Sequence, residues 1–194
     1  DIGICLGQAF AFAKKRVKNM KLWIMGPADE DEKYAKECYD LVESLGVKDV
    51  EFTGRVNVRD YLGKMDFTLL TSISEGQPLT ILESYAAHKP VITTDVGNCR
   101  ELIYGNEDGF GDAGILTHIM NIEEIAHAMV NMSINEENRK RMGEAGYKRV
   151  NAFYRIDQMK DVYREIYKGF SDSQNLSWTE ESFKINGHYS NPRK

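Results

Sequence analysis

The fold is decided by residues 67–94, which read FTLLTSISEGQPLTILESYAAHKPVITT. The apolar runs at residues 67–70 and 90–94 predict two short buried strands, and residues 78–87 between them predict a helix. Strands that are apolar throughout, rather than at every second residue, indicate a parallel sheet covered on both faces. Strand, helix and strand in this order form the repeating unit of α/β proteins.

The same alternation continues on both sides of this unit. Before it, the sequence predicts helices at residues 2–13, 34–45 and 60–64 and strands at residues 22–25 and 50–53. After it, the sequence predicts a Gly-rich loop at residues 105–114 and helices at residues 99–104, 122–132, 136–152 and 156–170. We therefore expect residues 1–170 to form an α/β domain with a Rossmann-like parallel sheet and helices on both faces. Residues 171–194 are polar and aperiodic, so we expect a mobile tail.

Composition disfavours several classes of protein. The chain has 25 Lys and Arg against 30 Asp and Glu, a net charge of -5, whereas nucleic-acid binding normally needs a basic face. Cys5, Cys38 and Cys99 lie far apart, without the spacing of a zinc site or a disulfide framework. We find no signal peptide and no apolar run of about 20 residues, so we expect a cytoplasmic protein that can still work at the inner membrane surface. The start at Asp1, without methionine, predicts a piece of a longer chain.

Residues 72–83, SISEGQPLTILE, carry the chemistry. They follow a predicted strand and open a helix, and ligands of open α/β sheets bind where strands end at their carboxyl side. Pro78 suits the first helical turn, because its missing N–H has no helical partner to lose. A helix N-terminus offers free N–H groups and partial positive charge to an anion. The groups predicted to hold a phosphate are the Thr80 hydroxyl and the N–H groups of Leu79, Thr80 and Ile81.

Two carboxylates flank this helix start. Gly76 lets a ligand approach the backbone, because no Cβ stands in the way. Glu75 can accept hydrogen bonds from sugar hydroxyls, and Glu83, about 7 Å along the helix axis from its start, can accept both hydroxyls of a ribose. Glu83 taken alone would be read as a solvated helix residue, but its spacing from Glu75 and the Gly-x-Pro start favour a functional pair.

The pair Glu75 and Glu83, separated by seven residues, resembles the motif of the family 4 retaining glycosyltransferases, which have the two-domain GT-B fold. The resemblance runs from residue 1 to about residue 170. The amino-acid sequence of residues 91–97 and 99–103 is most similar to that of the enzymes of Pel-type exopolysaccharide synthesis. By this resemblance, the chain is the C-terminal, donor-binding domain of such an enzyme.

The resemblance also implies roles for individual residues. Glu75 would be the catalytic residue that contacts the donor sugar, and Glu83 would bind the ribose. Backbone groups of residues 76–80, Gly76, Gln77, Leu79 and Thr80 among them, would face the sugar and the diphosphate, and Gly54 and Arg55 would lie beside the nucleobase. Arg55 can equally be an ordinary surface charge. Family members transfer a sugar from a nucleotide-sugar with retention and without a metal or other cofactor, and we expect a UDP-sugar as the donor here.

The chain departs from the family pattern in several places. The first strand, the Arg and Lys that hold the diphosphate, and the N-terminal acceptor domain all precede residue 1 in the family. We therefore expect this chain to bind a nucleotide-sugar without turnover, and the whole protein to serve exopolysaccharide or cell-surface glycan synthesis, with a membrane-bound polysaccharide synthesis complex as a partner. His88 and Asn98 stand where the family has glycine, and both types tolerate left-handed backbone.

Two other functions stay open at this point. A nucleotide-sugar epimerase of the same fold would use the same site, and a non-catalytic nucleotide-binding module would need no acceptor domain. A glycoside hydrolase is disfavoured, because its two carboxylates must flank one bond. The sequence does not fix the donor base, the sugar, the acceptor or the oligomeric state.

Overall fold

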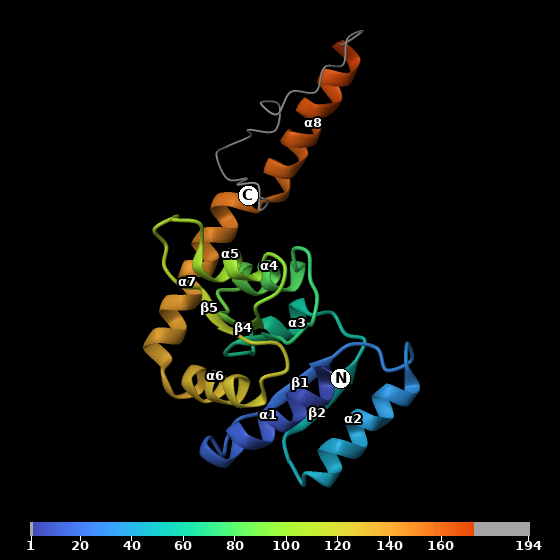
Figure 1. Ribbon diagram of the computed structural model, residues 1–194. Coiled ribbons are helices and arrows are strands. Elements are labelled where there is room, and N and C mark those ends of the chain that lie inside the picture. The colour runs from blue at the N-terminus through green and yellow to red at the C-terminus, as the bar shows by residue number, and fades with distance from the viewer. Residues whose placement is uncertain (1, 173–194) are drawn as a thin grey trace. The chain divides into compact units, whose positions relative to one another are not determined.

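The computed structural model describes residues 2–172, which form eight helices and five strands (Figure 1). In chain order these are α1 (Ile2–Arg16), β1 (Leu22–Met25), α2 (Glu32–Ser44), β2 (Val50–Gly54), α3 (Arg59–Leu62), β3 (Thr68–Leu70), α4 (Leu79–Ala86), β4 (Val91–Thr94), α5 (Cys99–Tyr104), β5 (Gly114–Thr117), α6 (Ile122–Ile134), α7 (Glu136–Phe153) and α8 (Ile156–Asp172). The chain divides into two compact units, residues 1–149 and residues 150–194. All five strands belong to the first unit, and α8 belongs to the second.

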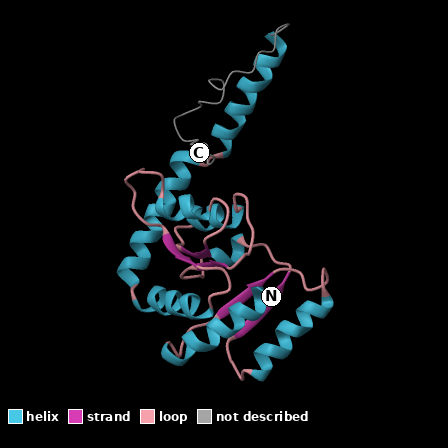
Figure 2. Ribbon diagram, viewed as in Figure 1, coloured by secondary structure: helices cyan, strands magenta, loops and turns pink. Residues whose placement is uncertain are grey.

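All strand pairs are parallel, as predicted, but they form two separate ladders (Figure 2). One ladder pairs β1 with β2, and Leu22 lies opposite Val50. The other has the order β3–β4–β5, in which Thr68 lies opposite Val91 and Val91 lies opposite Gly114. The expected α/β fold with parallel strands is confirmed, but the strands pair in two ladders rather than in one continuous sheet.

Helices cover both faces of the β3–β4–β5 ladder. On one face, the Thr68 hydroxyl lies 2.7 Å from the Ser84 hydroxyl of α4, and the Thr93 hydroxyl donates to the Cys99 thiol of α5 over 3.5 Å. On the other face, Ile92 packs into a core with residues of α1 and α6. Neighbouring residues of a strand point to opposite faces, which explains why these strands are apolar or uncharged throughout.

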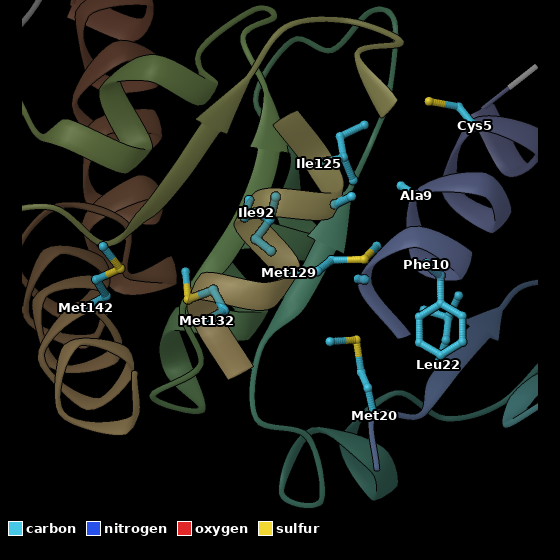
Figure 3. Packing of buried hydrophobic residues seen from close by; sticks show 13 residues of the cluster. Cys5, Ala9, Phe10, Met20, Leu22, Ile92, Ile125, Met129, Met132 and Met142 are labelled. Carbon is cyan, nitrogen blue, oxygen red and sulfur yellow. The ribbon is translucent and has the colours of Figure 1, made fainter. Parts of the chain in front are cut away.

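The core lies largely between α1 and α6, and Figure 3 shows Met129 of α6 pointing toward α1. On α1, Ala9 and Ala13 have no exposed surface, and small side chains at this spacing let the two helices approach closely. The other buried members of this core are Cys5, Phe10, Met20, Leu22, Ile92, Ile125, Ala126, Ala128, Met132 and Met142.

Strand β5 is the element that the sequence analysis missed. It lies at the end of the Gly-rich stretch that we expected to be a loop, and it has only four residues. A Cβ at Gly114 would lie 2.0 Å from the Val91 carbonyl oxygen, so glycine is required here by the close approach of β4. A glycine that suggests a loop in the sequence can therefore lie in a strand, where it allows a neighbouring strand to pack closely.

The helix ends follow local rules with one exception. The Asp31 carboxylate accepts a hydrogen bond of 3.0 Å from the Tyr34 N–H and so caps α2, and Gly46, after its end, has a left-handed φ of 60°. His88 has φ 57°, as its place after α4 predicted. Asn98 is the exception, because its φ is -88°, and Gly97 before it takes the left-handed conformation at 51°.

Among the described residues, the second unit contains the end of α7 and the whole of α8. The Met159, Tyr163 and Tyr167 side chains of α8 are more than half exposed, and they recur at positions that share one side of a helix. Within residues 2–172, no helix combines the length and the apolar character needed to cross a membrane. Residues 171 and 172, which we expected to belong to the tail, are part of α8, and residues 173–194 of the predicted tail lie outside the described residues.

Candidate functional site

The candidate site is the connection from β3 to α4, residues 71–78. It lies beyond the carboxyl end of β3, where the strands of a parallel sheet present their loops. Glu75 is half-buried, whereas Gly76 and Gln77 are exposed. A Cβ at Gly76 would meet nothing within 4 Å, so the space beside this backbone is open, as the ligand-approach argument requires.

The start of α4 has no side-chain cap. Pro78 occupies the N-cap position with φ -71° and ψ 117°, one residue earlier than the first helical turn in which we placed it. The next residues, Leu79, Thr80 and Ile81, lie in the first turn, where N–H groups lack a helical acceptor. Leu79 and Thr80 are exposed, and the Ile81 side chain is buried, so Ile81 can offer a ligand only its backbone. The helix start therefore retains its capacity to bind an anion.

The end of β4 and the turn that follows it hold this loop in place, which we did not expect from the sequence. The buried Thr94 hydroxyl donates to the Ser72 carbonyl oxygen, and the Asn98 N–H donates to the Gly76 carbonyl oxygen over 2.9 Å. A Gly-containing turn directly after an apolar strand was the signal that could have indicated this contact.

Glu83 is an exposed residue in the middle of α4, as predicted. Its backbone carbonyl accepts from the Ala87 N–H within the helix end, and its carboxylate is accessible to solvent. The structure therefore places the two glutamates on one continuous segment, with Glu75 before α4 and Glu83 within it.

Gly54 is the last residue of β2 and Arg55 follows it, so both lie at the end of a different ladder from the one that Glu75 follows. Gly54 has a left-handed φ of 67°, and Arg55 pairs with Glu30 over 3.5 Å at the exposed surface. Among the described residues, no hydrogen bond or ion pair joins this loop to residues 75–81. Residues 75–81 therefore form one continuous segment, whereas Gly54 and Arg55 stand at the end of a strand of the other ladder.

The surroundings of the loop carry charge and a buried thiol. Arg100, at the start of α5, pairs with Asp95 of the β4–α5 turn. Burial raises the pKa of the Cys99 thiol, so it stays protonated and is a packing residue rather than a nucleophile. Within residues 2–172, no three His, Cys, Asp or Glu side chains gather in a group that could hold a metal ion.

The fold and this site define an α/β protein with an uncapped helix start at the carboxyl edge of a parallel sheet. The family described as "Glycosyl transferases group 1" matches residues 6–149. The chain belongs to this family.

The chain is also similar to particular proteins. It is 32% identical over 162 residues to the N-acetyl-alpha-D-glucosaminyl L-malate synthase of Bacillus anthracis, covering 82% of this chain and 40% of that protein. It is 29% identical over 145 residues to an uncharacterized glycosyltransferase of Methanocaldococcus jannaschii, covering 73% of this chain and 40% of that protein.

A solved structure supports the fold. The chain aligns with HepE of Anabaena, solved in complex with UDP, at a TM-score of 0.74 and 20% identity, covering 85% of this chain and 44% of HepE. The expected fold, that of the GT-B glycosyltransferases, is confirmed by this likeness. The chain spans less than half the length of each of these proteins.

Proposed function

We propose that this chain is the donor-binding part of a glycosyltransferase that transfers a sugar from a UDP-sugar with retention of configuration. The observation that supports this most directly is the uncapped start of α4 next to Glu75, with open space at Gly76. Family membership points to the same reaction class. The choice of UDP rests on the neighbour HepE, which was solved with UDP and also with UDP-glucose.

Each residue of the segment has a distinct role in this proposal. The N–H groups of Leu79, Thr80 and Ile81 would bind the diphosphate, because the helix dipole favours negative charge at that end. Glu75 would accept hydrogen bonds from the sugar hydroxyls and act as the catalytic residue. Glu83 would accept from the two ribose hydroxyls. Gly76 and Gln77 would line the sugar through their backbone, and Gly54 and Arg55 would lie beside the base.

A titration of the chain with UDP and with UDP-glucose tests this proposal. We expect heat release and shifts of the backbone amide signals of residues 76–81, and no turnover by this chain alone. ADP at the same concentrations is the matched control, since it carries the same diphosphate on a different base. Amide shifts spread evenly over the chain, or none at all, would contradict the assignment.

We propose that binding needs no metal, because backbone N–H groups and the helix dipole meet the charge of the diphosphate. The affinity for UDP should therefore be the same with EDTA as with added Mg²⁺. An increase of tenfold or more with Mg²⁺ would contradict this.

The whole protein would work in exopolysaccharide or cell-surface glycan synthesis, as the resemblance of residues 91–97 and 99–103 to the Pel-type enzymes suggests. Its acceptor domain, and a membrane-bound synthesis complex as its partner, belong to the same proposal. The test is product analysis with the longer polypeptide and UDP-glucose. An α-linked product indicates transfer with retention, whereas a free nucleotide-sugar with an inverted sugar carbon would indicate an epimerase.

We also propose that the domain of residues 1–170 includes one further parallel strand, lying between β1 and β3. Leu22 and Thr68 direct their N–H groups into their own ladders, so Trp23 and Leu69 direct theirs away from them. A hollow of about 280 Å³ is lined by residues next to both edges, among them Trp23 and Phe67. Hydrogen exchange tests this, because the amides of Trp23 and Leu69 should be protected in a longer polypeptide that carries the added strand and should exchange readily in its absence.

A further inference from the structure

The end of β4 and the turn that follows it contact the loop that carries Glu75 at three points. The Thr94 hydroxyl donates to the Ser72 carbonyl oxygen, and the Asn98 N–H donates to the Gly76 carbonyl oxygen over 2.9 Å. Between these two hydrogen bonds, the α-carbon of Gly97 lies against the backbone of Glu75. The backbone is therefore fixed on both sides of the Glu75 carboxylate.

The contact at Gly97 leaves no room for a side chain. A Cβ built there would lie 2.0 Å from the Glu75 carbonyl oxygen and 2.7 Å from the Gly76 carbonyl oxygen. Both neighbours are backbone atoms, which cannot rotate out of the way as the end of a flexible side chain can. A methyl group at this position must therefore push the two loops apart by about 1 Å, a displacement large enough to lower the rate of a catalysed reaction about a hundredfold.

The turn itself is held by contacts with β5 and with the start of α5. The Asp95 N–H donates to the Thr117 carbonyl oxygen of β5 over 2.9 Å, and the Asp95 carboxylate pairs with Arg100. The Cys99 N–H donates to the Val96 carbonyl oxygen over 3.0 Å, which closes the turn at the start of α5. A displacement caused at Gly97 is consequently expected to fall on the exposed Glu75 loop rather than on the anchored turn.

We propose that Gly97 is a positioning residue, which sets the place of Glu75 relative to the start of α4. This inference rests on the proposed function, in which Glu75 contacts the sugar and the helix start contacts the diphosphate. Because Gly97 touches the first of these groups and not the second, it controls the recognition of the sugar more than that of the nucleotide. The quantity it governs is the ratio of the affinities for UDP-glucose and for UDP.

The test compares Gly97→Ala with Gly46→Ala in the 194-residue chain. Gly46 has a similar left-handed φ of 60° but nothing within 4 Å of its Cβ position, so Gly46→Ala carries the backbone strain without the collision. Calorimetric titration gives the affinities for UDP and UDP-glucose. We expect Gly97→Ala to lower the affinity for UDP-glucose at least tenfold relative to UDP, and Gly46→Ala to leave this ratio unchanged.

A second variant keeps the inference testable if Gly97→Ala does not fold. Thr94→Val removes the hydrogen bond to Ser72 while keeping the side-chain volume, and we expect it to lower the same ratio about threefold. An unchanged ratio in the folded variants would overturn the inference. The difference between Gly97→Ala and the wild type in the amide chemical shifts of Glu75 and Gly76, measured without ligand, provides a readout that does not depend on function. If the wild-type chain binds neither ligand, the proposed function fails, and the absence or presence of this difference still decides whether Gly97 positions the loop.

Discussion

The guanidinium of Arg149 donates to the Asp108 carboxylate at two points, from Nε to Oδ2 over 2.6 Å and from Nη2 to Oδ1 over 3.0 Å. Both side chains are buried, with exposed fractions of 1% and 4%. Arg149 also donates to the carbonyl oxygens of Leu102, Ile103 and Gly111. One side chain of α7 thus fixes the end of α5 and the Gly-rich loop after it.

Replacement of Arg149 should therefore destabilise the chain. Arg149→Met leaves the Asp108 charge buried without its cation, and losing one partner of a buried pair costs about 3 to 5 kcal/mol. Urea denaturation followed by circular dichroism measures this change. Lys148→Met is the control, because the Lys148 and Glu144 side chains are about half exposed and such surface pairs contribute at most about 1 kcal/mol. Equal effects of the two substitutions would show that the Arg149 network adds nothing.

Gly146 should not tolerate alanine, although alanine is the better helix former. A Cβ at Gly146 would lie 2.4 Å from the Tyr85 ring, which has no exposed surface of its own. We expect Gly146→Ala to lower the free energy of unfolding by about 1 to 3 kcal/mol, because overpacking outweighs a gain in helix propensity of about 1 kcal/mol. Gly63→Ala, at a position with nothing within 4 Å, should be neutral or stabilising. A stabilised Gly146→Ala would mean that Tyr85 can move.

Glu83→Ala should weaken UDP binding. Loss of the ribose contacts should raise the Kd for UDP about tenfold, equivalent to about 1.4 kcal/mol, without a change in stability. Glu137→Ala, which removes another helix glutamate that lies outside the proposed site, is the control for charge. A Kd that changes equally in both variants would assign the effect to net charge rather than to a contact.

Glu75→Ala should affect transfer more than nucleotide binding. In the longer polypeptide, we expect kcat to fall at least a hundredfold, while the Kd for UDP changes less than threefold. Steady-state rates with UDP-glucose and calorimetry with UDP measure the two quantities separately. A kcat close to that of the wild type would remove Glu75 from the catalytic role.

The pair of Lys14 and Asp49 should make stability depend on pH. The hydrogen bond from Lys14 lowers the pKa of Asp49 below its ordinary value of 3.8. The stabilisation is therefore complete above pH 3.8 and is lost as the pH falls through the lower pKa of the folded state.

Urea denaturation of wild type and Asp49→Asn across this range measures the effect. The difference in unfolding free energy between them should shrink as the pH falls below 3.8. Asp40→Asn, on the exposed surface of α2, is the matched control for the change in net charge. A difference that stays constant down to low pH would contradict the linkage.

The sequence by itself determined the class of fold, because apolar runs alternating with helical periodicity leave few arrangements other than a parallel α/β sheet. It also predicted the start of α4 near Pro78, since the Gly-x-Pro sequence is a local signal. We did not predict strand β5, because it begins at Gly114. This glycine is needed for the close approach of β4, but in the sequence it cannot be distinguished from a glycine in a loop. Only the tertiary structure showed the division into two ladders, the network of Arg149 and the contact of Gly97 with Glu75. These depend on residues 22 or more positions apart meeting in space, and such contacts arise from packing rather than from local backbone preference.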